Sequence, residues 1–475
     1  MKKKKSKFAE APPVASDINE ANALIEELWE QLRHYEDKLK TRGSNSSKPP
    51  SSDGPKERAE RKKPQSSGDR NPRGAKQGHS GSQRQLSKLK KSDTVIDCLP
   101  DATCPCCGQS DISVHNKPFY RHQVHEIPKP TVEISEYRLF SGQCRHCHEV
   151  VRAKKPDNVS QGIIGPNLLS YIAVLAGQYH LSIRKIRSLL KEQLGTTFSV
   201  GAISEAQTKV ASMLTPLHHA IRDSIQTAPL VHVDETSHPR NGEESLRWCW
   251  LVANEDLVYE KILFSRATHS AKTMLGKNYS GLVVTDQCPS YNWLKPEKHQ
   301  LCWSHVKRNL QQIAEYTGGG YTALVGQRLT LIANMVFRIR HRLENTEIQY
   351  EQYIRRMNRL RKSFDHWLGK GSGIVVQRYK GRCKKLQSHR QSLWLFLTDT
   401  SIPLTNNEAE RRIRGSVIQR KISFGTTSDA GDKFRGRMHS LVETCNKRGM
   451  SSLSALTKIV QAVTLRKPYP NVFNL

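Results

Sequence analysis

The sequence predicts a multidomain chain in which helical and cysteine-rich segments precede an α/β domain. A length of 475 residues is too great for one ordinary domain. Two Cys-x-x-Cys pairs mark a small module, and at Pro229 the apolar pattern changes from helical spacing to short strand-like runs. We therefore expect domains at 1–43, 44–92, 93–158, 159–227, 228–425 and 426–475, with an all-helical insertion at about 318–400.

The charge balance indicates a polyanionic partner. Lys and Arg number 75 against 44 Asp and Glu, which gives a net charge of +31. Because neutralised phosphates release counterions, we expect nucleic acid, although a basic protein of another kind would share this charge. The start MKKKKSKFAE lacks the apolar core of a signal peptide, and no apolar run is long enough to span a membrane. The sequence therefore predicts a cytoplasmic protein with no membrane partner.

The N-terminal segment predicts a coiled-coil helix and then a linker. Between Asp17 and Arg42, apolar residues recur in steps of three and four. The positions are Ile18, Ala21, Ile25, Leu28, Leu32, Tyr35 and Leu39. We expect self-association along this seam, and a helix packed on its own domain is the alternative. Residues 44–92 are rich in Lys, Arg, Ser, Gly and Gln, so we expect a disordered basic linker there.

The cysteine pairs predict a structural zinc site in a ribbon-like module. Each pair has two intervening residues, and thirty-six residues lie between the pairs. Two such turns supply the four sulfurs of a closed tetrahedral site. The expected ligands are Cys104, Cys107, Cys144 and Cys147. Cys106 could replace Cys107, His146 and His148 could compete, and reduced buried thiols are the other interpretation.

A helix-turn-helix-like region is predicted between Leu181 and Val210, with a break at Gly195. The apolar positions of the first helix would face inward and its basic positions outward. The inward set is Ile183, Ile186, Leu189 and Leu190, and the outward set is Arg184, Lys185, Arg187 and Lys191. We expect Arg184, Lys185 and Arg187 to contact DNA and the later helix to be available to a groove, whereas a simple helical hairpin would look similar.

Three carboxylates form the candidate catalytic set. Asp234 follows the strand-like run LVHV, Asp286 follows LVVT, and Glu410 lies on a later helix. Polar residues at the carboxyl ends of adjacent parallel strands share one crevice, where they can hold two Mg²⁺ ions.

Each of these carboxylates also has a structural interpretation. An Asp at a strand end is often a turn former, and Asn407 followed by Glu410 fits a capping box. Glu235 and Glu408 are possible substitutes, and periodicity does not choose among these residues.

The order of the motifs resembles the bacterial insertion-sequence transposases of the "sixty-six" family, which belong to the DDE group. The matching stretches are NSSKPPSSDG at 45–54, the cysteine pairs, VDET at 233–236, TDQCPSYN at 285–292, CWSHVKRNL at 302–310, NNEAERRIR at 406–414 and SLVETCNKRG at 440–449. Together they run through nearly the whole chain. Thr405 departs from the family, which often has Asp there, and we expect this to alter the cap of the last helix rather than the trio.

The resemblance implies an RNase H-like catalytic domain in which Asp234, Asp286 and Glu410 are the catalytic residues and hold two Mg²⁺ ions. Beside this site, His305 and Arg308 lie one helical turn apart, and Arg411 and Arg414 flank Glu410. We expect these four to contact DNA phosphates, although a solvated basic face would explain them as well.

The expected function is DNA transposition: cleavage at the 3′ ends of an insertion sequence and transfer of those ends to target DNA. The partners would be duplex DNA of the terminal inverted repeats and of the target, and further copies of the chain, at least a dimer at synapsis. Accessory proteins encoded by the element are also possible partners. The alternatives are an RNase H-like nuclease without strand transfer and a catalytically inactive, zinc-containing DNA-binding regulator.

Overall fold

The computed structural model describes residues 14–43, 45, 85–90, 94–110, 112–127, 130–157 and 159–475. The chain divides into two units, 63–133 and the remainder, and we describe each separately. Most of the predicted linker at 44–92 lies outside the described residues. In the 63–133 unit, the described part contains no helix or strand. Among all described helices, none has the length and apolar character needed to cross a membrane.

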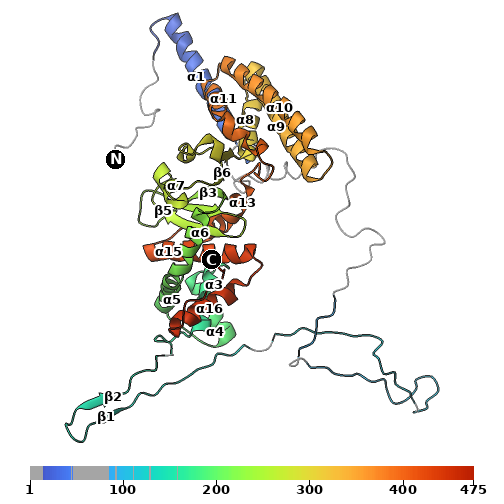
Figure 1. Cartoon of the computed structure of the whole chain (residues 1–475), viewed down its shortest axis with the longest axis vertical. Helices are drawn as coiled ribbons and strands as arrows, with labels where there is room; N and C mark the ends of the chain where they lie inside the picture. Colours follow the sequence, from blue (N-terminus) through green and yellow to red (C-terminus); the bar gives the residue numbers. More distant parts are fainter. Residues whose placement is uncertain are drawn as a thin grey trace. The chain divides into compact units, whose positions relative to one another are not determined.

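A five-stranded mixed sheet forms the centre of the larger unit (Figure 1). Its order is β5-β4-β3-β6-β7, with β3 antiparallel to β4, β4 antiparallel to β5, and β3, β6 and β7 parallel. The bounds are β3 Leu230–His238, β4 Arg247–Ala253, β5 Val258–Leu263, β6 Leu282–Thr285 and β7 His299–Leu301. The strand-like runs LVHV and LVVT lie in β3 and β6, so the change of apolar pattern at Pro229 correctly predicted strands here.

One strand boundary differs from the prediction. Asp234 does not end its strand, because β3 continues to His238 through antiparallel pairing with β4. The parallel pairing of β3 with β6 covers only Leu230 to His232. Asp234 therefore lies just beyond the point where β3 and β6 separate, and this still places it at the carboxyl edge of the parallel strands.

Helices from both ends of the larger unit share one hydrophobic core with the sheet. These helices are α3 Pro166–Gly177, α4 Ile183–Leu194, α5 Val200–Met213, α6 Thr215–Gln226, α7 Thr268–Leu275, α15 Asp429–Lys447 and α16 Ser452–Thr464. The hydroxyls of Ser440 and Thr444 on α15 accept hydrogen bonds from the backbone N–H groups of Glu260 and Val258 in the edge strand β5. Helix α15 thereby covers an edge that would otherwise be open to pairing.

A helical segment, hereafter the insertion, follows β7 and has a second hydrophobic core; its helices span the expected range of about 318–400. It includes α8 Trp303–Ala314, α9 Gly320–Glu344, α10 Tyr350–Lys370, α11 Gln377–Ser388 and α12 Arg390–Leu393. Trp303, Trp394 and Phe396 pack against one another in its interior. The chain then returns to the sheet through α13 Asn407–Arg412 and α14 Arg414–Ser423. Helices α9 and α10 lie side by side (Figure 1).

The predicted N-terminal helix is α1, Ile18–Leu39, and its start is capped by Asp17. Near its other end, the buried Asp37 carboxylate accepts hydrogen bonds from the backbone N–H and the hydroxyl of Thr317. The Asp37 carboxylate also forms an ion pair with Arg378. The end of α1 is therefore held on the helical insertion.

Candidate active site

The three predicted carboxylates come from three separate elements, and the charges of Asp286 and Glu410 both act on Asp234. Asp234 belongs to β3, Asp286 directly follows β6, and Glu410 lies in α13. Burial raises the pKa of the Asp234 carboxyl well above its usual value, and neighbouring carboxylates raise it further. These neighbours are Glu235, Asp286 and Glu410. The sheet and α13 thus concentrate negative charge at one place, as a site for divalent cations requires.

The structural alternative for Glu410, a capping box that starts at Asn407, is not what the structure shows. The N-cap of α13 is Asn406, which makes no side-chain capping bond. The Glu410 carboxylate lies instead 3.4 Å from His305 Nδ1 and 3.6 Å from Arg308 Nη2. Two residues that the sequence placed near the site, His305 and Arg308, therefore contact the third carboxylate directly. Partial exposure of the Glu410 side chain leaves it accessible to a ligand.

Asn406 connects the strand that carries Asp234 to the helix that carries Glu410. Its side chain is fully buried, and its amide donates a 2.7 Å hydrogen bond to the carbonyl of Val233. The Asn406 Oδ1 lies 3.2 Å from His232 Nδ1. The backbone carbonyl of Asn406 accepts the N–H of Glu410 at 3.1 Å. These contacts fix the distance between β3 and the first turn of α13.

Glu235 and Glu408, the two carboxylates that could replace members of the trio, both contact cationic side chains. Glu235 is buried, accepts a 2.8 Å hydrogen bond from Arg266 Nε and one from the Tyr291 hydroxyl, and has its pKa raised, chiefly by burial. Glu408 contacts Arg412 and Lys447. Burial alone would raise the Glu408 pKa, but these two cations hold it below its usual value. Glu408 is therefore neutralised locally, and Glu235 has fewer free oxygen lone pairs for a metal than Glu410.

Among the described residues, two sets of potential ligand atoms lie close enough to share one ion; one contains Glu410, the other contains Asp286, and Asp234 belongs to neither. The potential ligand atoms of Cys302, His305 and Glu410 lie within 4.8 Å of one another, as do those of Glu235, Asp286 and Cys288. His305 Nε2 faces Arg308 Nη1 at 3.4 Å, so a cation bound by His305 would meet a neighbouring positive charge. The oxygen donors of Asp234, Asp286 and Glu410 suit Mg²⁺ better than these mixed sets, since Mg²⁺ prefers oxygen ligands.

The predicted DNA-contacting residues of the helical region lie on α4. Arg184, Lys185 and Arg187 are exposed, while Ile186 and Leu190 are buried. The turn after α4 has Gly195 at φ 64°, a conformation that favours glycine, and the Ser199 hydroxyl caps α5. Helix α4 thus presents a basic face, as the sequence predicted.

The later helix, α5, has a different surface. It packs on α3 and α15, and its exposed Lys209 pairs with Glu205 at 2.8 Å. The cationic surface of this hairpin therefore belongs to the first helix and not to the second. Beside Glu410, Arg411 and Arg414 are both exposed.

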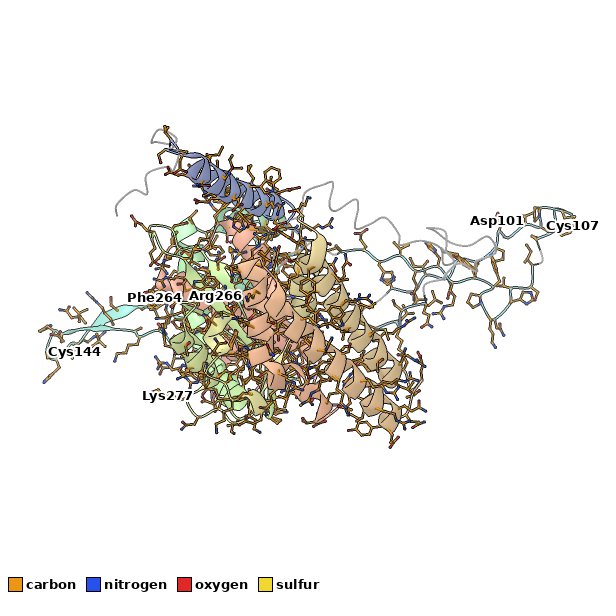
Figure 2. The ribbon with its side chains drawn as sticks, turned by 90° about the horizontal axis from the view of Figure 1, so that it is seen from above. Asp101, Cys107, Cys144, Phe264, Arg266 and Lys277 are labelled. Carbon is orange, nitrogen blue, oxygen red and sulfur yellow. The ribbon has the colours of Figure 1, made fainter. Side chains whose placement is uncertain are left out.

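Both cysteine pairs adopt the same backbone turn. The N–H of Cys104 donates to the carbonyl of Gln109, and that of Cys144 donates to the carbonyl of Glu149, each at 2.8 Å. In both turns hydrogen bonds, first from the backbone of Cys107 or Cys147, lower the pKa of the leading cysteine. Figure 2 shows Cys107 and Cys144, each on an extended arm of the chain. Strands β1 Ser141–Gln143 and β2 Val150–Arg152 pair around the second turn.

No role was assigned from the sequence to two supporting residues, Asn406 and Arg266. Asn406 stands out only as part of NNEAE, and its hydrogen bonds to β3 depend on the folded sheet. The hydrogen bond of Arg266 to Glu235 joins residues thirty-one positions apart, and Figure 2 shows Arg266 at the surface of the sheet region.

Comparison with known protein families matches residues 161–433, more than half of the chain, to the transposase IS66 family. The chain belongs to this family. Residues 10–85 of this transposase also match a family of unknown function. Its relatives include three uncharacterized proteins of Sinorhizobium fredii. The protein y4hP is 22% identical over 79% of this chain and 72% of its own length, and y4qI is 22% identical over 78% and 73%. The third, y4jO, is 27% identical over 36% of this chain and 49% of its own length.

Proposed function

We propose that this IS66-family transposase cleaves the 3′ ends of an insertion sequence and joins them to target DNA at a site made by Asp234, Asp286 and Glu410. The observation that carries this proposal is the convergence of the three carboxylates where β3 and β6 separate. The sheet, with three antiparallel strands extended by two parallel ones, supports an RNase H-like catalytic domain. The long helical insertion between Asp286 and Glu410 agrees with the same assignment.

The trio offers the donor set that a pair of Mg²⁺ ions needs. All three ligands are carboxylates, and their crowding disfavours full ionisation without a cation nearby. Bound magnesium would activate a water or 3′-hydroxyl on one side of the phosphate and stabilise the leaving oxygen on the other. The chain itself holds the ligands in place through Asn406 and keeps Glu235 engaged with Arg266. No serine, tyrosine or cysteine nucleophile is required by this chemistry.

The DNA contacts we propose lie beside this site and on α4. His305 and Arg308 already face Glu410, and the exposed Arg411 and Arg414 can reach phosphates beside it. Arg184, Lys185 and Arg187 on α4 would contact the terminal inverted repeats. We also propose that the protein acts in the cytoplasm and that accessory proteins encoded by the element are among its partners.

A structural zinc ion would join the two cysteine turns. The matching hydrogen bonds at Cys104 and Cys144 favour thiolates at the head of each pair, and thiolate is the form that binds zinc. We propose that this ion closes the module at 93–158 with Cys104, Cys107, Cys144 and Cys147 as ligands. The module would then present a DNA-binding surface without exposing the metal to chemistry.

The decisive experiment compares wild type with Asp286→Asn in Mg²⁺, on a duplex that carries the element's own ends. We expect cleavage and strand transfer to fall by roughly 1000-fold or more, because loss of a metal ligand removes several kcal/mol of transition-state stabilisation. Asp256→Asn, which makes the same change at an exposed turn, is the matched control and should retain activity.

Other outcomes would support the alternatives. Cleavage without joining by the wild type would favour the nuclease. Tight binding without chemistry from either protein would favour the inactive regulator.

A further inference from the structure

Helix α10 of the insertion has two sharply different faces. Its inner face is buried and apolar, with Tyr353, Met357, Phe364 and Leu368 inside the second core. Its outer face carries the exposed cations Arg355, Arg359, Lys362 and Lys370. Spacings of four, three and eight residues place these cations in one row along the helix.

No acid forms an ion pair with this row in the described part of the chain, although the exposed Glu351 lies one turn before Arg355 on the same helix. In the continuous described stretch 159–475, no ion pair involves Arg355, Arg359, Lys362 or Lys370. The neighbouring helix α9 is different, since Arg340 pairs with Glu344 at 2.7 Å. Like charges one turn apart destabilise a helix. The outer face of α10 therefore has an electrostatic cost that a bound polyanion would offset.

The surroundings reinforce the charge. Between residues 318 and 400 there are 16 Lys and Arg and only five Asp and Glu. The acid nearest in sequence to the middle of the row, Asp365, pairs with Arg390 at 2.5 Å and is not available to the row. The excess of positive charge is thus a property of the whole insertion, and α10 presents it on an exposed face.

We propose that the outer face of α10 binds the phosphate backbone of duplex DNA. From Arg355 to Lys370 the helix rises by roughly 22 Å at about 1.5 Å per residue, and duplex DNA carries one negative charge per roughly 1.7 Å. The row therefore meets several phosphates at once. Contacts of this type position DNA without reading its sequence. The inference rests on the proposed function, and it adds a surface separate from α4 and from the residues around Glu410.

The experiment measures equilibrium binding of the full-length protein to duplex DNA without divalent metal, over a range of salt concentrations. The variant Arg355→Gln/Arg359→Gln/Lys362→Gln removes three charges while keeping long, helix-compatible side chains. The control Lys277→Gln/Lys298→Gln/Lys458→Gln removes the same charge from three scattered exposed positions. Thermal melting of both proteins checks that the fold is retained.

If three phosphate contacts are lost, the negative slope of the logarithm of the association constant against the logarithm of salt concentration should become shallower by about 2.7. The affinity should drop roughly tenfold or more for all DNA sequences alike. The control should keep the wild-type slope. Equal slopes for the two triple variants would overturn the inference. Because this binding assay involves no chemistry, a wild type that fails to cleave DNA would count against the proposed function and leave the role of α10 intact.

Discussion

Glu260 and His439 form a buried ion pair outside the candidate active site. Glu260 lies in β5 with 1% of its side chain exposed, and its Oε2 is 2.7 Å from His439 Nδ1 of α15. The Ser416 hydroxyl of α14 donates to the same carboxylate. Burial favours the neutral forms, yet the interaction is strong enough to lower the Glu260 pKa and raise the His439 pKa. The pair therefore joins the edge strand to two helices.

His439→Gln should destabilise the protein most in mildly acidic solution. Because the His439 pKa is raised in the folded protein, this pair stabilises the fold at pH values below about 6.5, the pKa of an unfolded histidine. The contribution disappears as the pH rises through the folded pKa. The stability that comes from the lowered Glu260 pKa is present above about pH 4.3 and is lost only as the pH falls through the folded pKa of Glu260. We expect a loss of about 3–5 kcal/mol near pH 6 that shrinks at pH 9.

Urea unfolding at the two pH values measures this difference in the free energy of unfolding. The exposed His366→Gln is the control and should have little effect at either pH. An equal loss at pH 6 and pH 9 for His439→Gln would mean that packing, and not charge, is what the substitution removes.

At the scale of elements, the position of α13 relative to β3 depends on Asn406. Asn406→Ala removes the donor to Val233 and the contact with His232, and leaves the Val233 carbonyl without this partner. Because a misplacement of about 1 Å near the reacting groups can cost roughly 100-fold in rate, we expect cleavage per folded molecule to fall roughly 10- to 100-fold.

The neighbouring Asn407→Ala is the matched control, since Asn407 is exposed and opens α13. Cleavage rates in Mg²⁺ and melting temperatures should be compared for both variants. A lower melting temperature with an unchanged rate for Asn406→Ala would assign this residue to stability alone.

The sequence predicted elements better than it predicted their connections. Local apolar patterns were enough to place the strand runs LVHV and LVVT and the N-terminal helix. It ended β3 too early at Asp234, because the extension to His238 comes from pairing with β4, which is distant in sequence. In the same way, the sequence showed His305 and Arg308 one turn apart, but their contact with Glu410 depends on how α8 and α13 meet at the sheet.

For the whole molecule, α1 presents a continuous apolar seam to solvent. Ile25, Leu28, Leu32 and Tyr35 are 61%, 59%, 62% and 55% exposed. Asp37 is the only buried residue of α1, and it lies on the face of the helix opposite the seam, against the insertion. Within the described residues, the seam is not covered by the chain's own domains. A second copy of α1 is therefore the partner that the heptad pattern favours.

Replacing Leu28 and Leu32 with Glu should weaken self-association of the full-length transposase. Each leucine buried in a helix pair contributes about 1.5–3 kcal/mol, and a charge in the seam adds repulsion between the two copies. Sedimentation velocity over a range of concentrations should show a dimer or larger species for wild type and a shift toward monomer for Leu28→Glu/Leu32→Glu. Leu246→Glu/Leu331→Glu changes two exposed leucines outside α1 and should behave as wild type. Because the Asp37 contacts lie outside the seam, the variant should keep α1 on the insertion, so an unchanged oligomer would show that the copies meet elsewhere.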